Sequence, residues 1–398
     1  MGETESDTGK TDKTIFNTEE TRFVVISWER WVEIASEVGQ GNKMVRICFS
    51  SSIRQTLYPS ARFVKYLQKP LPTKSSSSSS SSFSTTPLFL RPPIHSASFP
   101  DLKNWQDWAK HLALSVGPKF VEADNGPDAD LLCRELKWLL QDAVVDDEND
   151  AGFVKLRADL EEMYALWTQR IEERRPFQYL VGCEHWRDLV LCVQEGVLIP
   201  RPETEHIVDM VEEVICEDEG MREGLWVDLG TGSGALAVGI GRMLGDGGRL
   251  IATDLSPVAG SVTAFNVRRY GLQDKVDVRL GSWFEPLQDV NGKPVGLVSN
   301  PPYIPGDHIF GLQAEVARHE PRIALDGGEN GMDALLHLCE GAATLMKPGG
   351  FFALETNGEK QPEFLVDFMT SKMKGRFRDV RVVSDFAGVQ RFVSGFCC

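Results

Sequence analysis

The chain has 398 residues, which is enough for two folded domains and additional sequence. Apolar residues make up 42% of it, which suits a globular protein, and no run approaches the roughly 20 apolar residues of a membrane span, so no membrane association is expected. The formal net charge is −16, and residues 101–398 alone carry −19, which argues against stable binding to nucleic acid. The eight cysteines form no C-x-x-C pair, so we expect neither a zinc or other metal site nor a disulfide framework.

The N-terminal hundred residues divide into two parts of opposite charge. Residues 1–43 are acidic and form an extension of uncertain role, whereas residues 44–100 contain basic side chains, no acid and a serine run over 75–82. A basic, serine-rich and acid-poor composition is typical of an organelle transit peptide, and Met44 would be its natural start. The alternative is a disordered low-complexity linker. We interpret 44–100 as a disordered, transit-like segment that directs the protein to the chloroplast stroma, with the mitochondrial matrix as the alternative.

Residues 101–175 have the apolar spacing of helices. The periodic positions are Leu102, Trp105, Trp108, Ala109, Leu112, Leu132, Leu136, Leu139, Leu140, Leu156, Leu160, Met163, Leu166 and Ile171. We expect a small helical bundle, which either docks the substrate or stabilises the following domain. Residues 176–205 change to strand-like character and contain two prolines at 200 and 202, which predicts a hairpin linking the two domains.

From residue 206 to 398 short apolar runs alternate with helical stretches. The apolar runs are 225–229, 250–253, 276–280, 295–299 and 351–354, and the helical stretches lie near 234–244, 256–270, 331–346 and 360–374. This alternation predicts an α/β fold with a doubly wound parallel sheet. Two further strands near 378–384 and 389–394 are separated by a tight turn, so we expect an antiparallel hairpin at the edge of a seven-stranded sheet.

Three signals follow the first three of these strands. The segment Asp228-Leu229-Gly230-Thr231-Gly232-Ser233-Gly234 opens a helix, and its glycines let a ligand approach the backbone closely, although a purely structural turn is the alternative. Asp254 ends the second strand, where a carboxylate can accept both hydrogen bonds of a ribose diol or can simply cap the next helix. Trp283 follows the third strand and either packs against an adenine ring or belongs to the core.

The fourth signal, Asn300-Pro301-Pro302-Tyr303, ends the fourth strand. An amide or exocyclic amine nitrogen is a poor nucleophile because its lone pair is delocalised, so it must pyramidalise to attack a sulfonium methyl group. The Asn300 side-chain oxygen and the Pro301 carbonyl can accept its N–H bonds, and the prolines hold both acceptors in place. Tyr303 can lie against the flat face of the substrate. These residues predict an N-methyltransferase that needs no acid–base dyad.

The chain resembles the bacterial-type protein-(glutamine-N5) methyltransferases that act on peptide-chain release factors, in an organelle-targeted form. Besides the glycine loop and Asn300–Tyr303, the matching segments are 176–182, 199–205, 320–322, 324–328, 349–350, Glu355, Gln361 and 387–388. The resemblance implies a Rossmann-like methyltransferase sheet that binds S-adenosyl-L-methionine and methylates the glutamine of the Gly-Gly-Gln loop in class I release factors. It implies cofactor binding by Asp228, Gly230, Thr231, Gly232, Ser233, Gly234, Asp254, Trp283 and Asn300. It implies catalysis by Asn300, Pro301 and Tyr303, and substrate binding by these residues with Pro302 and Arg201.

Two positions depart from the family pattern. Ser282 stands where the family usually has Asp, which changes a hydrogen bond to the adenine, and Thr356-Asn357 replaces the usual Ile-Gly, which changes a turn beside the site. Two other functions remain open at this point. One is an N6-adenine DNA or RNA methyltransferase, which faces the same chemical problem with an exocyclic amine but must also hold a nucleic-acid backbone. The other is an assembly factor that binds S-adenosylmethionine without turnover.

Overall fold

The computed structural model describes residues 17–18, 21–22, 86–145, 152–358 and 360–398. Strands β1 (Asn17–Thr18) and β2 (Thr21–Arg22) form an antiparallel pair within a unit that spans Met1–Ser78. All other described elements belong to a second unit, Ser79–Cys398. The interpretations of 1–43 and 44–85 therefore concern residues that, apart from that strand pair, lie outside the described ones.

Residues 86–100 are folded, which corrects the expectation that disorder extends through residue 100. A short 3-10 helix forms over Leu88–Leu90, and Leu88 is completely buried. Strand β3 (His95–Ser98) then pairs antiparallel with β5 (Phe153–Leu156). Arg91 donates a hydrogen bond of 2.6 Å to Glu162. Apolar burial and strand pairing thus join this stretch to the helical region that follows it.

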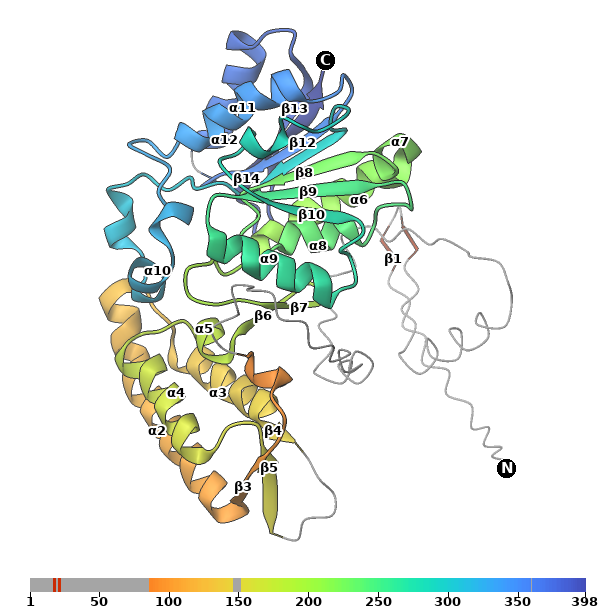
Figure 1. The fold of residues 1–398 in the computed structure, drawn as a ribbon. Coiled ribbons are helices and arrows are strands. Elements are labelled where there is room, and N and C mark those ends of the chain that lie inside the picture. Colours follow the sequence, from red (N-terminus) through yellow and green to blue (C-terminus); the bar gives the residue numbers. More distant parts are fainter. Residues whose placement is uncertain (1–16, 19–20, 23–85, 146–151, 359) are drawn as a thin grey trace, which may run out of the picture. The chain divides into compact units, whose positions relative to one another are not determined.

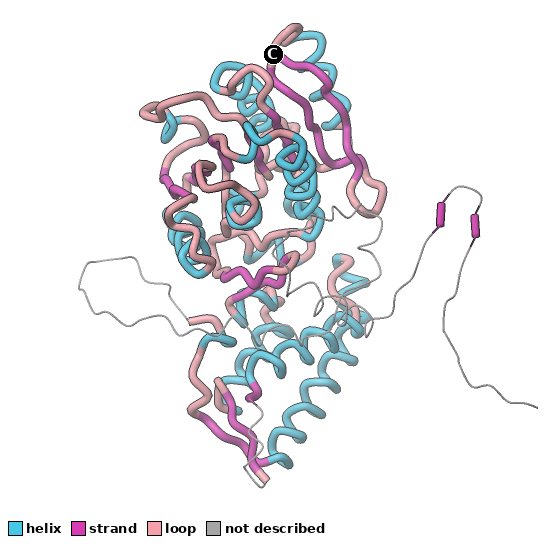
Figure 2. The backbone as a smooth tube through the Cα atoms, turned by 90° about the vertical axis from the view of Figure 1, so that its right-hand side faces the viewer, coloured by secondary structure: helices cyan, strands magenta, loops and turns pink. Residues whose placement is uncertain are grey.

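Three helices form the core of that region. They are α2 (Phe99–Asp124), α3 (Ala129–Ala143) and α4 (Leu160–Glu172). Each begins with a side-chain cap, from Ser98, Asp128 and Asp159, which satisfies an otherwise unpaired backbone N–H. Trp105 and Trp167 are fully buried between the helices. The structure also contains a small antiparallel sheet of β3, β5 and β4 (Val144–Val145), which the sequence did not predict (Figure 2). Strand β3 leads directly into α2.

A helical turn and a hairpin join the helical region to the sheet domain. They are α5 (Phe177–Val181), β6 (Cys183–Trp186) and β7 (Leu189–Cys192), and the two strands are antiparallel. The Asn266 side chain bridges this hairpin to the glycine loop, because its Nδ2 donates to the carbonyls of Cys192 at 2.9 Å and Ser233 at 2.8 Å. The hairpin therefore supports the loop expected to hold the cofactor.

Seven strands form the main sheet, in the order β10-β9-β8-β11-β12-β14-β13. They are β8 (Leu225–Leu229), β9 (Arg249–Asp254), β10 (Val276–Leu280), β11 (Gly296–Ser299), β12 (Phe351–Glu355), β13 (Phe377–Ser384) and β14 (Gln390–Cys397). The first five run parallel, and β14 is antiparallel to both neighbours. The chain reverses its direction of winding between β8 and β11, which is the switch point where open α/β sheets bind ligands.

Helices cover both faces of this sheet (Figure 1). They are α6 (Glu205–Glu217), α7 (Glu219–Arg222), α8 (Ala235–Gly241), α9 (Pro257–Arg269), α11 (Asp333–Leu345) and α12 (Gln361–Asp367). Helix α10 (Ala314–His319) lies away from the sheet, beside the helical region. One buried cluster joins α6, α8 and α9 to the sheet, and another joins α11 and α12 to its opposite face. The expected doubly wound, seven-stranded fold with a C-terminal antiparallel hairpin is confirmed. Across the described ranges, no helix combines the length and apolar character needed to cross a membrane.

Candidate active site

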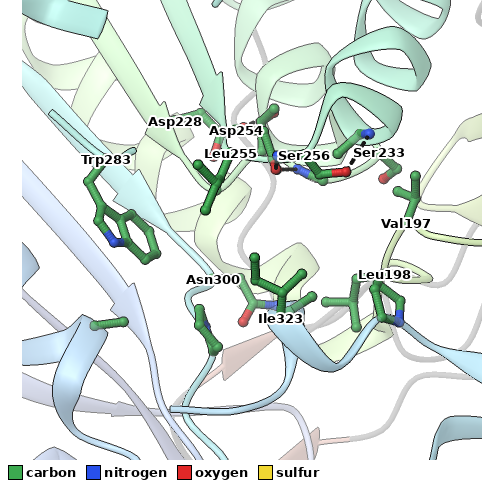
Figure 3. A pocket seen from close by; sticks show the side chains of 18 of the residues that line it. Val197, Leu198, Asp228, Ser233, Asp254, Leu255, Ser256, Trp283, Asn300 and Ile323 are labelled. Atoms are coloured by element: carbon green, nitrogen blue, oxygen red, sulfur yellow. Dashed lines mark hydrogen bonds between the residues drawn. The ribbon is translucent and has the colours of Figure 1, made fainter. Parts of the chain in front are cut away.

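A cavity of about 500 Å³ lies at the carboxyl ends of the parallel strands. Six parts of the sheet domain line it: the glycine loop after β8, the end of β9, the turn after β10, the start of the Asn-Pro-Pro-Tyr segment after β11, the segment near 321–328 and the first turns of α11. The segment from Gly196 to Thr204, which precedes α6, completes the wall. Asp228 and Asp254 lie on one side, Asn300 and Ile323 face them, and Trp283 lies at one end (Figure 3). The structure therefore brings the four sequence signals together around one space.

The glycine loop is held in shape by its own backbone. The N–H groups of Gly230 and Thr231 both donate to the carbonyl of Thr253 on β9, at 2.9 Å. Gly234 has φ +82°, and a Cβ at this position would lie 3.0 Å from the Thr263 side chain on α9, so only glycine fits. The loop is therefore a rigid cradle that permits close approach from the cavity side.

Asp228 has a buried carboxylate at the base of this loop. It is completely buried, its Oδ2 accepts a hydrogen bond of 2.6 Å from the Thr231 hydroxyl, and its Oδ1 has no partner. Burial, reinforced by the charge of Asp254, raises the pKa of Asp228 to about 7. A cationic group in the cavity would satisfy the free oxygen and would favour the ionised form.

Asp254 bonds to the backbone on two sides and also faces the cavity, so the two alternatives of the sequence are compatible. Its Oδ1 accepts from the N–H of Ser256 at 2.8 Å, and its Oδ2 accepts from the N–H of Gly232 at 2.9 Å. A carboxylate has about four lone-pair positions, so each oxygen can still accept one more hydrogen bond. Asp254 thus fixes the glycine loop and the start of α9 while offering two acceptors to a diol in the cavity. Burial raises its pKa.

Trp283 both lines the cavity and packs against the core cluster around α11. Its backbone has φ +46°, and its carbonyl accepts a hydrogen bond of 3.3 Å from Thr253. A Cβ at Gly230 would lie 3.4 Å from the indole ring, so the ring covers the glycine loop closely. Ser282 also lines the cavity, and its N–H donates to Glu285 at 3.2 Å.

Asn300 is fixed by a chain of hydrogen bonds that sequence reasoning missed. Its Nδ2 donates to the Thr204 hydroxyl at 3.0 Å, and that hydroxyl donates to Glu355 Oε2 at 2.7 Å. The Tyr303 hydroxyl donates to the other carboxylate oxygen, Oε1, at 3.1 Å. Thr204 and Glu355 both belong to segments that match the family, but a single sequence does not reveal that the two segments meet.

The rest of the Asn-Pro-Pro-Tyr segment is held from the side of β12 and α12. Pro302 lines the cavity, Pro301 is buried, and neither Pro301 nor Tyr303 is among the described residues of the cavity wall. Gln361 donates from Nε2 to the carbonyls of Tyr303 at 2.9 Å and Gly331 at 3.1 Å. Burial, with the adjacent Glu355 carboxylate, raises the pKa of Tyr303 above its usual value. The predicted stacking of Tyr303 on the substrate stays a prediction.

Two further sequence signals have structural partners. Arg201 donates from Nη2 to Glu320 Oε1 at 2.6 Å and is not among the described lining residues, so its expected contact with the substrate stays a prediction. Thr356, at one of the departures from the family pattern, is buried and donates to the carbonyl of Arg391 at 2.9 Å. Its hydroxyl accepts from the N–H of Gly358, so the altered turn after β12 has its own hydrogen bonds.

The charge of the cavity wall suits a cationic ligand. Its described lining residues include four aspartates and one histidine but no lysine or arginine. S-adenosylmethionine carries positive sulfonium and ammonium groups, and its ribose carries a vicinal diol. The free oxygen of Asp228, the two acceptors of Asp254 and the Trp283 ring therefore fit this cofactor.

Comparisons with known proteins find close relatives for most of the described chain. The release factor glutamine methyltransferase of Gloeobacter violaceus is 44% identical over 239 residues, which cover 60% of this chain and 80% of that protein. The protein of the same description from Synechocystis is 37% identical over 274 residues, covering 65% of this chain and 88% of that protein. Among solved structures, the N-terminal domain of human METTL16 in complex with SAH has a TM-score of 0.39 at 14% identity, covering 65% of this chain and 89% of that one. No protein-family model matches the chain.

Proposed function

Because this chain belongs to the release factor glutamine methyltransferase family, we propose that it methylates the side-chain amide nitrogen N5 of the glutamine in the Gly-Gly-Gln loop of an organellar class I peptide-chain release factor. The methyl donor is S-adenosyl-L-methionine, which supplies an electrophilic sulfonium methyl group when bound. The observation that carries the proposal is the position of Asn300, which lines the acidic cavity at the end of β11 with its amide nitrogen bonded to Thr204.

The protein's own residues perform three tasks in this reaction. Asp228, Asp254 and Trp283 hold and orient the cofactor. The Asn300 side-chain oxygen, together with the Pro301 carbonyl, accepts hydrogen bonds from the substrate amide and helps its nitrogen to pyramidalise. The two prolines of the Asn-Pro-Pro-Tyr segment hold these acceptors in place, so that little reorganisation is needed in the transition state.

The organelle is proposed from composition alone. The basic, acid-free segment 44–100 supports import, and its serine run over 75–82 favours the chloroplast stroma over the mitochondrial matrix. A reporter fused to residues 44–100 should enter plastids, and a cytosolic reporter would refute the targeting. The net charge of −19 over residues 101–398 supports a protein substrate and no stable nucleic-acid partner.

The test is methyl transfer from labelled cofactor to four kinds of acceptor. These are the intact release factor, its Gly-Gly-Gln glutamine→Ala version, duplex and single-stranded DNA, and RNA. We expect methylation of the intact factor alone, at the mapped glutamine. Comparable methylation of nucleic acid would favour the adenine methyltransferase, and binding of the cofactor without any turnover would favour the assembly factor.

Asn300→Ala removes the acceptor on which the proposal depends. We expect the rate to fall roughly 100–1000-fold, because an oriented acceptor of this kind is worth about 3–4 kcal/mol in the transition state. Cofactor affinity should change far less, since the glycine loop and Asp254 remain. Calorimetry with the cofactor and single-turnover kinetics with the release factor separate the two effects. A variant with wild-type turnover would exclude the assigned role of Asn300.

A further inference from the structure

The hydrogen bonds around Thr204 have only one consistent direction when Glu355 is ionised. A carboxylate can only accept, so the single hydroxyl proton of Thr204 points to Glu355 Oε2, 2.7 Å away. The Thr204 oxygen then offers only a lone pair to Asn300. The Asn300 group facing it must therefore be the amide nitrogen, at 3.0 Å, and the amide oxygen is left for the cavity.

This direction matters because the two ends of an asparagine amide have opposite functions. The oxygen accepts the N–H bonds of a substrate amide, whereas the nitrogen would meet them with another donor. We propose that Thr204 and Glu355 are positioning residues that hold the Asn300 amide with its oxygen toward the substrate. The proposal rests on the proposed function and extends it to Thr204, which also lines the cavity, and to Glu355, which is not among its described lining residues.

The surroundings of Glu355 make the hydrogen-bond chain through Thr204 to Asn300 sensitive to protonation of the Glu355 carboxylate. Glu355 is 1% exposed, and the groups facing it are Thr204, the Tyr303 hydroxyl, Arg391 on β14 and Glu203. Burial raises the pKa of Glu355 to about 7, although the two hydroxyls and Arg391 oppose the shift. A protonated carboxyl can donate to Thr204, which frees the Thr204 proton for Asn300 and allows the amide to turn over. The productive orientation therefore belongs to the ionised form and increases with pH.

Thr204→Val removes the hydroxyl that links Glu355 to Asn300 and changes the shape of the side chain little. Thr204→Ser is the matched control that keeps the hydroxyl. With the intact release factor at saturating cofactor, we expect kcat to fall at least about tenfold in Thr204→Val and to stay near wild type in Thr204→Ser. Calorimetric affinity for the cofactor, which reports the folded state, should change by less than about twofold in both. Equal kcat values in the Val and Ser variants would overturn the proposal.

The pH dependence supplies a readout that a merely structural role would not move. Wild-type kcat should rise about tenfold between pH 6 and pH 8, following ionisation of a group with a pKa near 7. Saturating cofactor removes any contribution of Asp228 to this profile. Both Thr204→Val and Glu355→Gln should show a flat profile, and Glu355→Gln should add little in the Thr204→Val background. If kcat of Thr204→Val still rose with pH, the proposed hydrogen-bond chain from Glu355 through Thr204 to Asn300 would be contradicted.

A measurement without substrate separates this proposal from the proposed function. In protein labelled with ¹⁵N-asparagine, the side-chain NH₂ signal of Asn300 is identified by its loss in Asn300→Ala. That signal should titrate near pH 7 in the wild type and should not titrate in Thr204→Val or Glu355→Gln. If the Asn300 signal titrates but no release factor is methylated, the proposed substrate is refuted and the positioning role of Thr204 and Glu355 is not. If a release factor is methylated but the Asn300 signal does not depend on pH, only the positioning role is refuted.

Discussion

At the scale of single residues, the sequence located the polar groups of the site but not their partners. Asp228, Asp254 and Asn300 lie at the carboxyl ends of parallel strands, and parallel strands bring these ends to one edge, so their convergence was predictable. The contact of Thr204 with Glu355 was not, because 151 residues separate them and no local pattern records which segments meet. The ion pair of Arg201 with Glu320 was likewise not visible in the sequence, and the expected contact of Arg201 with the substrate stays a prediction.

Asp254 gives the first prediction at this scale. Asp254→Ala removes two acceptors from the cavity and the bonds to Gly232 and Ser256. Hydrogen bonds to a charged group are worth about 1.5–3 kcal/mol, so cofactor affinity should fall roughly 10–100-fold in calorimetry. Asp246→Ala, at an exposed acid before β9, is the control and should bind the cofactor as the wild type does. Unchanged affinity in folded Asp254→Ala would exclude ribose binding.

At the scale of elements, periodicity predicted the long and regular segments and missed the short ones. The strands of the main sheet agree with their predicted positions to within a few residues. The central strands β8, β11 and β12 are buried apolar runs, which makes them visible in the sequence. The strands β3, β4 and β5 have two to four residues each, too few for alternation to be visible. Helix α10 is also short, and its importance lies in tertiary contacts that the sequence does not show.

Those contacts form a buried charge cluster between α10 and the helical region. Arg170 on α4 donates to Glu135 on α3 at 2.7 Å and to Glu315 on α10 at 2.9 Å, and Arg174 donates to Glu315 at 2.6 and 2.7 Å. All four residues are less than 9% exposed. Burial acts to raise the pKa of Glu315, but the hydrogen bonds from the two arginines outweigh it and lower the pKa. The cluster therefore ties the helical region to the segment that leads to the cavity wall.

The second prediction concerns this cluster. Arg170→Met leaves Glu135 and Glu315 buried without their shared cation, and breaking a buried pair in this way costs about 3–5 kcal/mol. The free energy of unfolding in urea should fall by that amount. Lys103→Met removes an exposed pair with Asp107 on α2 and should cost less than about 1 kcal/mol. If the two variants lost equal stability, the buried cluster would have no special role in joining the two regions.

For the whole molecule, the arrangement of the two regions suggests how a large substrate is recognised. Asp124 at the end of α2 accepts from the N–H of Ala314 at 2.9 Å, and the carbonyl of Asn125 accepts from Gln313 at 2.6 Å. These bonds, with the charge cluster, hold the helical region against α10. From α10 the chain continues directly into residues 321–328, which supply part of the cavity wall. The helical region is thus fixed relative to the cavity that Asn300 lines.

The last prediction follows from this geometry. If the helical region docks the release factor, an intact factor gains contacts that a peptide containing only the Gly-Gly-Gln loop cannot make. Docking contacts far from the reacting nitrogen bind the ground state and the transition state alike, so they should lower KM for the intact factor more than they raise kcat. We expect kcat/KM for the peptide to be at least about tenfold lower, mainly through KM. Steady-state kinetics with both substrates, each paired with its glutamine→Ala version, measures this. Equal values of kcat/KM would leave the helical region with stabilisation as its function, because the cavity alone would then account for recognition.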